Sequence, residues 1–236
     1  RRQCFPAAVP NEAADTGTTI FETDALRLWH LRDDVGIVSF RTKQHTISDA
    51  LLDGMLRAID HAERELAGVV IWQPRKPFSL GADLGALAPA IERGAWAGIE
   101  ATVELFQRVS QRLRYCAVPT IAAVRGMALG GSCEFILHCD RTVAALESYI
   151  GLVETGVGLL PAGGGSKELA IRAAAEVERG ANGGQLDLFP FLRTYFQNVA
   201  MATVSKSALD ACDLGYLRAS DAVVLHADEV LHVALG

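Results

Sequence analysis

The sequence predicts an α/β fold, and three observations on the 236-residue chain support that prediction. Short apolar runs alternate with longer segments whose apolar residues recur at helical spacing, which is typical of strand–helix–strand crossovers. Half of the residues are apolar and 21% are charged, a globular composition that excludes intrinsic disorder. The sequence has no repeat of the kind that builds a solenoid. A chain of this length can bury one sizeable core, so we expect one main domain.

The N-terminal part of the chain predicts a leader followed by a pair of strands. Residues 1–20 lack periodicity and contain two prolines, so we interpret them as a linker or leader before a domain that spans 21–236. Residues 26–31 alternate between apolar and polar side chains, and residues 35–40 are mostly apolar. Asp33-Asp34 between these runs favours a hairpin turn.

Helices and buried strands are then expected to alternate. Ser48 carries the hydroxyl group expected at a helix N-cap, and apolar residues at helical spacing follow it. A short apolar run predicts a buried strand at 68–72, and a loop through 81–83 separates it from an amphipathic helix over about 95–114. A second buried strand is expected at 119–124, so the pattern is that of helical crossovers between strands.

The C-terminal part of the chain is predicted to be mainly helical. A helix is expected at 133–138, and a Gly- and Asn-rich segment at 180–190 interrupts the later helical pattern. Residues 192–235 have helical periodicity apart from one short apolar strand at 222–225.

Composition argues against several classes of partner. The net charge is −6 and no Lys or Arg cluster exceeds two or three residues, so nucleic acid is not expected as a partner. No apolar run reaches the ~18 residues that a membrane helix needs, and no signal-peptide pattern is present. Five widely spaced cysteines, an odd number, favour a reducing compartment, and the histidines have no metal-ligand spacing. We therefore expect a cytoplasmic protein without a metal centre, and its Arg-rich, Ala-rich composition indicates a bacterial source.

The segment at 125–165 contains the candidate chemistry. Gly130 and Gly131 lie between the strand at 119–124 and the helix at 133–138, where glycine permits a sharp turn and close approach of backbone N–H groups to a ligand. The unpaired N–H groups and the positive dipole at a helix start suit an oxygen on which negative charge develops.

Two carboxylates near this turn are candidate proton-transfer groups. Glu134 lies in the first helical turn and Glu154 in an apolar stretch, where a carboxylate must find a partner, change protonation state or face a cleft. A proton-shuttling site uses two such groups. Simpler interpretations remain open: Glu134 as a complement to the helix dipole, and Glu154 as a surface acid.

Other motifs in this segment favour packing over chemistry. The glycines at 163–165 fit a turn and helix start better than a phosphate cradle, and neither Walker nor G-x-G-x-x-G spacing is present. The G-x-S-x-G pattern of a serine hydrolase is incomplete around Ser132. Cys133 and Cys139 are expected to be buried packing residues, and His138 a helix C-terminal residue rather than a ligand.

Several motifs in this chain follow one another in an order found in a known enzyme family. They are the run ALGGSCE at 128–134, then Glu154, then the triple glycine at 163–165. The loop SLGADL at 79–84 and the segment at 207–217 add an upstream and a downstream match. Together they resemble the enoyl-CoA hydratase/isomerase (crotonase) superfamily.

The resemblance, which covers roughly residues 26–235, implies a fold and a substrate class. The implied fold is a spiral of ββα repeats with a helical C-terminal region that builds a homotrimer or a hexamer. The implied substrates are acyl-CoA thioesters, so coenzyme A is part of the substrate and neither a metal nor a redox cofactor is required.

The resemblance also implies a set of site residues. The backbone N–H groups of Ala82 and Gly131 would hold the thioester oxygen, as an oxyanion hole. Glu134 would orient and activate the attacking water, and Glu154 would be the acid at C2. The residues implied to line the path of the adenine and pantetheine are Leu80, Asp83 and Leu84.

This chain departs from the family pattern at several places. The usual K-x-L-N-A-L junction is KQHTIS at 43–48, and the usual T-Q-R-L is SKEL at 166–169. The unusual stretch at 173–199 is interpreted as an insertion. The family continues with further helices where this chain ends at Gly236, and there is no initiator Met. We therefore expect a fragment of a multifunctional fatty-acid oxidation protein, joined to a 3-hydroxyacyl-CoA dehydrogenase.

Three functional hypotheses follow from the resemblance. The first is an enoyl-CoA hydratase, a hydro-lyase of β-oxidation, which the presence of both glutamates favours. The second is an enoyl-CoA isomerase or an acyl-CoA hydrolase of the same superfamily. The third is a catalytically silent CoA-binding domain of a larger protein, which binding without turnover would distinguish from the two enzymes.

Overall fold

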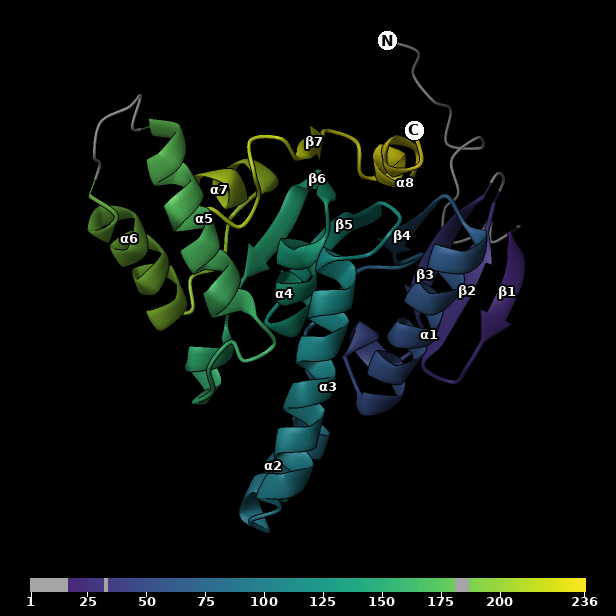
Figure 1. Ribbon diagram of the computed structural model, residues 1–236, viewed down its shortest axis with the longest axis horizontal. Coiled ribbons are helices and arrows are strands. Elements are labelled where there is room, and N and C mark those ends of the chain that lie inside the picture. Colours follow the sequence, from purple (N-terminus) through teal and green to yellow (C-terminus); the bar gives the residue numbers. More distant parts are fainter. Residues whose placement is uncertain (1–16, 32–33, 181–186) are drawn as a thin grey trace.

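The computed structural model describes residues 17–31, 34–180 and 187–236, and the strands in these ranges form one seven-stranded sheet (Figure 1). The strands lie in the sheet in the same order as in the sequence. They are β1 (Thr18–Glu22), β2 (Leu26–His30), β3 (Val35–Phe40), β4 (Gly68–Trp72), β5 (Thr120–Leu129), β6 (Arg141–Gly151) and β7 (Ala222–Val224).

The strand direction changes once within the sheet. β1, β2 and β3 pair antiparallel, whereas β3 to β7 pair in parallel. The antiparallel pairing of β2 with β3, with Leu28 opposite Val38, agrees with the predicted hairpin. Asp33 of the expected turn lies outside the described residues.

Helices connect the parallel strands, and the predicted α/β class with a helical C-terminal region is confirmed. Ser48 caps the first helix as predicted, because its Oγ accepts a hydrogen bond from the Leu51 N–H at 3.3 Å. The helices in the described ranges are α1 (Asp49–Glu65), α2 (Leu84–Glu92), α3 (Trp96–Arg114), α4 (Gly131–His138), α5 (Gly165–Gly180), α6 (Phe189–Ala200), α7 (Ala208–Asp213) and α8 (Val230–Ala234).

Side chains from both faces of the sheet are buried. On β4, Val69 and Ile71 belong to the core beneath α1, α3 and α4, whereas Val70 and Trp72 belong to a second core on the other face. The short helix α8 packs on β5 and β6 and contributes to this second core. A continuous apolar run is therefore required on the central strands, which is why their sequences do not alternate.

Some elements differ from the sequence-based predictions. β1 begins at Thr18, inside the range expected to be a linker. β5 continues through Gly126 to Leu129 with an irregular register, and the long strand β6 was not predicted. The 173–199 stretch contains the end of α5 and most of α6, and residues 181–186 within it lie outside the described residues.

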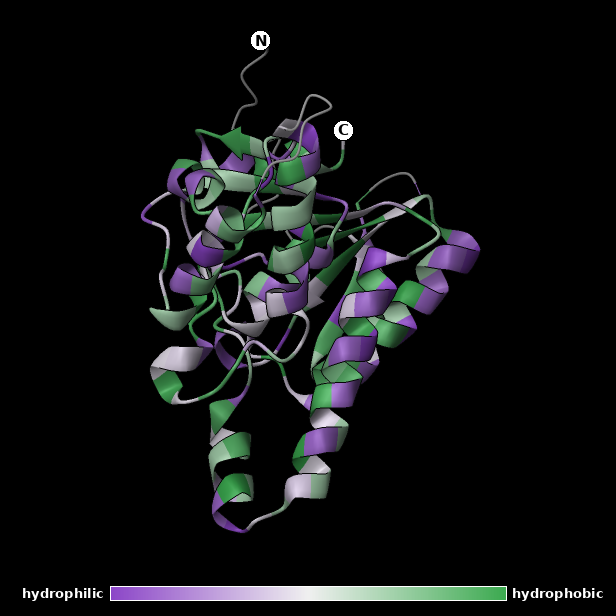
Figure 2. Cartoon of the chain, turned by 60° about the vertical axis from the view of Figure 1, so that its left-hand side comes forward, coloured by the Kyte–Doolittle hydropathy of each residue, from purple (hydrophilic) through white to green (hydrophobic). Residues whose placement is uncertain are grey.

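The helices α2 and α3 form a hairpin that projects from the body of the molecule (Figures 1 and 2). No residue of α2 is buried, although most of its side chains are apolar, and Pro89 lies inside it. The C-terminal half of α3 packs into the core through Phe106, Val109 and Leu113. This anchored half positions Phe106 beside the candidate site.

Candidate active site

A strand-to-helix turn at Gly130 organises the candidate site. β5 ends at Leu129 and α4 begins at Gly131, two residues earlier than predicted. Gly130 has a φ of 56°, a conformation that L side chains rarely adopt. Its N–H donates to the Gly151 carbonyl at the end of β6, at 2.9 Å. The start of α4 is therefore fixed beside the end of β6.

The loop that carries Ala82 packs against this turn. A Cβ built on Gly81 would lie 3.1 Å from the backbone nitrogen of Gly131. The Gly81 carbonyl and the Asp83 N–H both bond to Ile47, so the Ala82 N–H is directed away from that bridge. Within the described residues, neither Ala82 nor Gly131 donates its N–H to a backbone acceptor. Two backbone donors at this turn are therefore available to a ligand.

Glu134 is buried in the first turn of α4, and its carboxylate faces the start of α5. Its Oε1 accepts a hydrogen bond from the Gly165 N–H at 2.8 Å. Burial and the charge of Glu154 raise the pKa of Glu134 to about 8, against the opposing effect of the N–H groups of Gly163, Gly164 and Gly165. Glu134 lies in the first turn of its own helix, as the simpler interpretation expects, and its carboxylate also binds the N-terminus of α5.

The glycines at 163–165 form a turn that encloses this carboxylate. A Cβ built on Gly163 would lie 2.6 Å from Glu134 Oε2, and one built on Gly165 would lie 3.1 Å from Oε1. Gly164 has a φ of 120°, which only glycine adopts readily. The predicted turn and helix start are confirmed, because α5 begins at Gly165. The turn binds a carboxylate of the same chain.

Glu154 opens a short 3-10 helix, η3 (Glu154–Val157), beside Gly130. A Cβ built on Gly130 would lie 3.5 Å from Glu154 Oε1. Both carboxylate oxygens are buried, and burial raises the pKa of Glu154 to about 7 against the opposing effect of the backbone N–H groups of Glu154 and Val153. The interpretation of Glu154 as a surface acid is therefore wrong. Thr155 Oγ1 donates to the Val199 carbonyl at 2.7 Å and so fixes η3 to the end of α6.

The three residues expected along the coenzyme A path lie next to Ala82. Leu80 and Leu84 are exposed, and Leu84 is the first residue of α2. The Asp83 side chain caps that helix by accepting a hydrogen bond from the Gly85 N–H at 3.0 Å. The two leucines are therefore the apolar groups that this segment leaves open to a ligand.

The other polar residues of the motif have packing roles. Cys133 and Cys139 belong to the buried core, as predicted, and burial raises the pKa of both thiols, that of Cys139 to about 12. Both remain protonated at neutral pH, which excludes a thiolate nucleophile here. His138 is the last residue of α4, as predicted.

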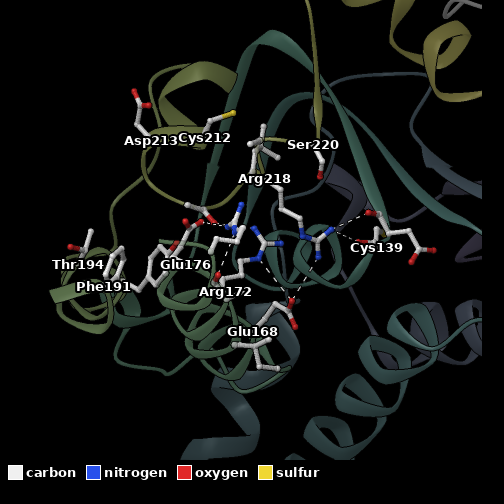
Figure 3. Close-up of a pocket in the computed structure, with 18 of the residues that line it drawn as sticks. Cys139, Glu168, Arg172, Glu176, Phe191, Thr194, Cys212, Asp213, Arg218 and Ser220 are labelled. Carbon is white, nitrogen blue, oxygen red and sulfur yellow. Dashed lines mark hydrogen bonds and ion pairs between the residues drawn. The ribbon is translucent and has the colours of Figure 1, made fainter. Parts of the chain in front are cut away.

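A separate cavity of about 1090 Å³ lies between α5, α6 and α7 (Figure 3). None of the four expected catalytic and oxyanion residues lines it. Its wall includes the buried Glu168, whose Oε1 is 2.7 Å from Arg114 Nη1. The guanidinium groups of Arg218 and Arg172 lie 3.7 and 3.9 Å from the same oxygen. Sequence analysis gave Glu168 no role, because Arg114 is 54 residues away in the chain.

The described residues contain no group of three or more His, Cys, Asp or Glu side chains that could hold a metal ion. In the same ranges, no helix has both the length and the apolar character needed to cross a bilayer.

The sequence comparisons identify a family and longer relatives. A model of the family described as enoyl-CoA hydratase/isomerase matches residues 34–178. A probable 3-hydroxyacyl-CoA dehydrogenase of Bacillus subtilis (strain 168) is 33% identical over 220 residues, which are 93% of this chain and 27% of that protein. A putative fatty acid oxidation complex trifunctional enzyme of Rickettsia felis is 33% identical over 157 residues, 66% of this chain and 22% of that protein. The chain therefore spans about a quarter of the length of these relatives.

Solved structures share the fold. The crystal structure of an enoyl-CoA hydratase from Polaromonas sp. JS666 superposes with a TM-score of 0.72 at 24% identity, over 89% of this chain and 74% of that one. The enoyl-CoA hydratase from Bacillus anthracis gives a TM-score of 0.71 at 22% identity, with the same two coverages. Both matches concern the fold alone, which is the one that the motifs implied.

Proposed function

The chain belongs to the enoyl-CoA hydratase/isomerase (crotonase) family, and on that premise we propose that it adds water across the double bond of a 2-enoyl-CoA thioester. The observation that carries this proposal is a grouping around the Gly130 turn of two buried carboxylates with two N–H donors that have no backbone acceptor among the described residues. Hydration needs both kinds of group, since charge develops on the thioester oxygen while protons are transferred at two carbons.

The N–H groups of Ala82 and Gly131 are proposed to bind the thioester oxygen. When water attacks C3, the electron pair of the double bond moves toward the carbonyl and an enolate oxygen forms. Fixed donors stabilise that charge without reorganisation, and loss of one such donor in other enzymes costs ~3–4 kcal/mol of transition-state stabilisation. Leu80 and Leu84 would then lie along the coenzyme A path, since both are exposed next to Ala82.

The two carboxylates are proposed to divide the proton transfers. Glu134 takes a proton from the attacking water while the oxygen of that water bonds to C3. Glu154 gives a proton to C2. At the end of the addition Glu134 is protonated and Glu154 is ionised, so one proton must return to Glu154 before the next cycle. The pair therefore works with a single proton between the two residues.

The raised pKa values support this single-proton state at neutral pH. With values of about 8 for Glu134 and about 7 for Glu154, the first ionisation leaves one proton on the pair. On the proposed roles, that proton lies on Glu154 when the substrate is bound.

We further propose that the chain is the hydratase module of a larger multifunctional fatty-acid oxidation protein that also carries a 3-hydroxyacyl-CoA dehydrogenase. The names and lengths of the two curated relatives support this parentage. A reducing, cytoplasmic compartment is supported by the four described cysteines, all of which are free. Assembly into a homotrimer or hexamer is supported by the exposed apolar face of α6, which includes Phe189 and Phe196.

The hydratase proposal is tested by ultraviolet absorbance of a short 2-enoyl-CoA mixed with the protein. We expect loss of the conjugated-thioester band with the wild-type chain and with Glu147→Gln, which changes an exposed glutamate on β6. The Glu154→Gln and Glu134→Gln variants are expected to lose about 10²–10⁴-fold in rate, the usual contribution of one acid–base group.

Three outcomes would contradict the hydratase proposal. A 3-enoyl-CoA that gains the conjugated band, with no loss from the 2-enoyl ester, would identify an isomerase. Release of free coenzyme A would identify a hydrolase. Saturable binding of the 2-enoyl ester without any change in absorbance would identify a silent CoA-binding domain.

A further inference from the structure

His138 occupies a position that the proposed chemistry does not use. It lies one helical turn after Glu134, is fully buried, and has its Nδ1 2.7 Å from the Glu134 backbone oxygen. Because a carbonyl can only accept, Nδ1 carries a proton. Nε2 has no hydrogen-bond partner within the described residues, and burial lowers the pKa of the imidazole. The ring is therefore neutral and has a fixed tautomer.

The imidazole ring fills the space over Gly164. A Cβ built on Gly164 would lie 2.8 Å from His138 Cε1 and 2.9 Å from Nε2. Gly164 is the middle residue of the turn at 163–165 whose N–H groups face the Glu134 carboxylate. The turn therefore contacts two side chains of α4, the Glu134 carboxylate and the His138 ring, which lie one helical turn apart.

The far end of the same turn is fixed by Glu168. The Glu168 N–H donates to the Gly164 carbonyl at 2.9 Å, in the first turn of α5. The Glu168 carboxylate is in turn held among Arg114, Arg172 and Arg218, the last two of which are drawn with it in Figure 3. The ion pairs of Glu168 therefore fix the start of α5. The position of the turn relative to Glu134 then depends on the side chain that packs between the turn and α4.

We propose that His138 is a positioning residue, which holds the 163–165 turn against Glu134 so that its N–H groups keep the carboxylate in one orientation. The proposal builds on the proposed function, because the orientation of Glu134 matters to hydration. The packing of the ring on Gly164 positions the turn. The hydrogen bond from Nδ1 is secondary, because the Glu134 carbonyl that accepts it is already held in place by the α4 backbone.

The expected signature is a change in the titration of Glu134. N–H donors stabilise the ionised carboxylate, so a turn that moves away from Glu134 raises the pKa of Glu134 further. A loss of stability without displacement of the turn has no such effect. The charged groups facing the ring are Glu168 and Lys167 from α5 and Arg114 from α3, and they stay unchanged in every variant below.

The experiment compares four proteins by two readouts. His138→Asn keeps a donor near the Nδ1 position but removes the ring edge from Gly164, whereas His138→Phe keeps the ring and removes the donor. Leu137→Ala is the matched control, because Leu137 is equally buried in α4 but belongs to the apolar core. The readouts are the pH profile of kcat/KM for a short 2-enoyl-CoA and a carbon-13 NMR titration of Glu134 without substrate.

We expect the alkaline limb of the profile and the Glu134 titration to move up by roughly one pH unit in His138→Asn. We expect a lower kcat at an unchanged KM in that variant, and wild-type titration in His138→Phe and Leu137→Ala. An unmoved titration in His138→Asn, or an equal shift in Leu137→Ala, would overturn the proposal. If His138→Asn does not fold, His138→Gln takes its place. A wild-type chain without hydratase activity would contradict the proposed function alone, since the NMR titration needs no substrate.

Discussion

At the scale of single residues, burial of Glu134 and Glu154 makes the stability of the protein depend on pH. Both carboxyl groups have folded-state pKa values of about 8 and about 7, above the value of 4.5 for an exposed glutamate. At pH values between the unfolded-state and folded-state pKa values, the native state therefore binds more protons than the unfolded state. The free energy of unfolding falls as the pH rises through that range. We expect the free energy of unfolding in urea to fall by a few kcal/mol from about pH 5 to about pH 8.5.

Variants isolate the contribution of these two residues from that of the histidines. The Glu134→Gln/Glu154→Gln double variant cannot ionise at either position, so most of the fall in the free energy of unfolding with rising pH should disappear. Glu147→Gln changes an exposed glutamate and should keep the wild-type slope. A double variant whose stability falls as steeply as that of the wild type would mean that neither carboxylate is buried in its neutral form.

The same two groups set the pH range of the proposed reaction. A pair that works with one proton is active between its two macroscopic pKa values. The plot of kcat/KM against pH should therefore be bell-shaped, with an acid limb at pH about 7 and an alkaline limb at pH about 8. The measurement is the initial rate of hydration at low substrate, over about pH 5.5 to 9.5. A rate that rises steadily across this range would exclude a protonated acid at C2.

Sequence analysis found the candidate groups of the site but not what holds them. Ala82, Gly131, Glu134 and Glu154 were expected from motifs, and the fold brings all four to the Gly130 turn. The function of the 163–165 glycines was missed, because their partner Glu134 lies about 30 residues upstream and the contact is tertiary. Only a structure reveals that a Cβ at 163 or 165 would meet the Glu134 carboxylate.

At the scale of elements, α5 depends on the buried charge of Glu168. That carboxylate faces the guanidinium groups of Arg114, Arg172 and Arg218, and its removal takes away the buried counter-charge that the three share. We expect Glu168→Gln to lower the free energy of unfolding by roughly 3–5 kcal/mol, as measured in urea.

A second glutamate on α5 provides the control for that measurement. Glu176 pairs with Arg179 near the surface, where ion pairs contribute ~0–1 kcal/mol, so Glu176→Gln should be nearly neutral. Equal effects at the two positions would show that the three arginines do not need Glu168 as a counter-charge.

Elements were predictable where local signals were strong. α1 has a Ser48 cap and a clear apolar face, and it begins where the sequence predicts. α2 lacks buried residues and contains Gly85 and Pro89, so its sequence has no apolar face at helical spacing that would predict a helix. β6 mixes buried and exposed positions because it pairs first with one half of β5 and then, after an irregularity, with the other. Such a register change is decided by the neighbouring strand.

At the scale of the whole molecule, the exposed face of α6 is where we expect copies of the chain to meet. Phe189 and Phe196 are 65% and 71% exposed. Large apolar side chains that are exposed together on one face are typical of a surface that binds a partner. We expect sedimentation to detect an oligomer for the wild-type chain and a shift toward the monomer for Phe196→Asp. Leu225→Asp changes a residue after β7 that is even more exposed, at 82%, and should leave the oligomer intact. An unaltered oligomer in Phe196→Asp would place the interface elsewhere.

The sheet order bears on how the chain is assembled during synthesis. Each strand pairs with the strands that precede and follow it in the sequence, from β1 to β7. A growing chain can therefore add strands one at a time to an edge that already exists, and no strand must wait for a distant partner. The candidate site is built from residues 82 to 165, so all of its groups are synthesised before α6. Translation order and spatial order coincide, and α6 is made later than the η3 segment that it fixes in place.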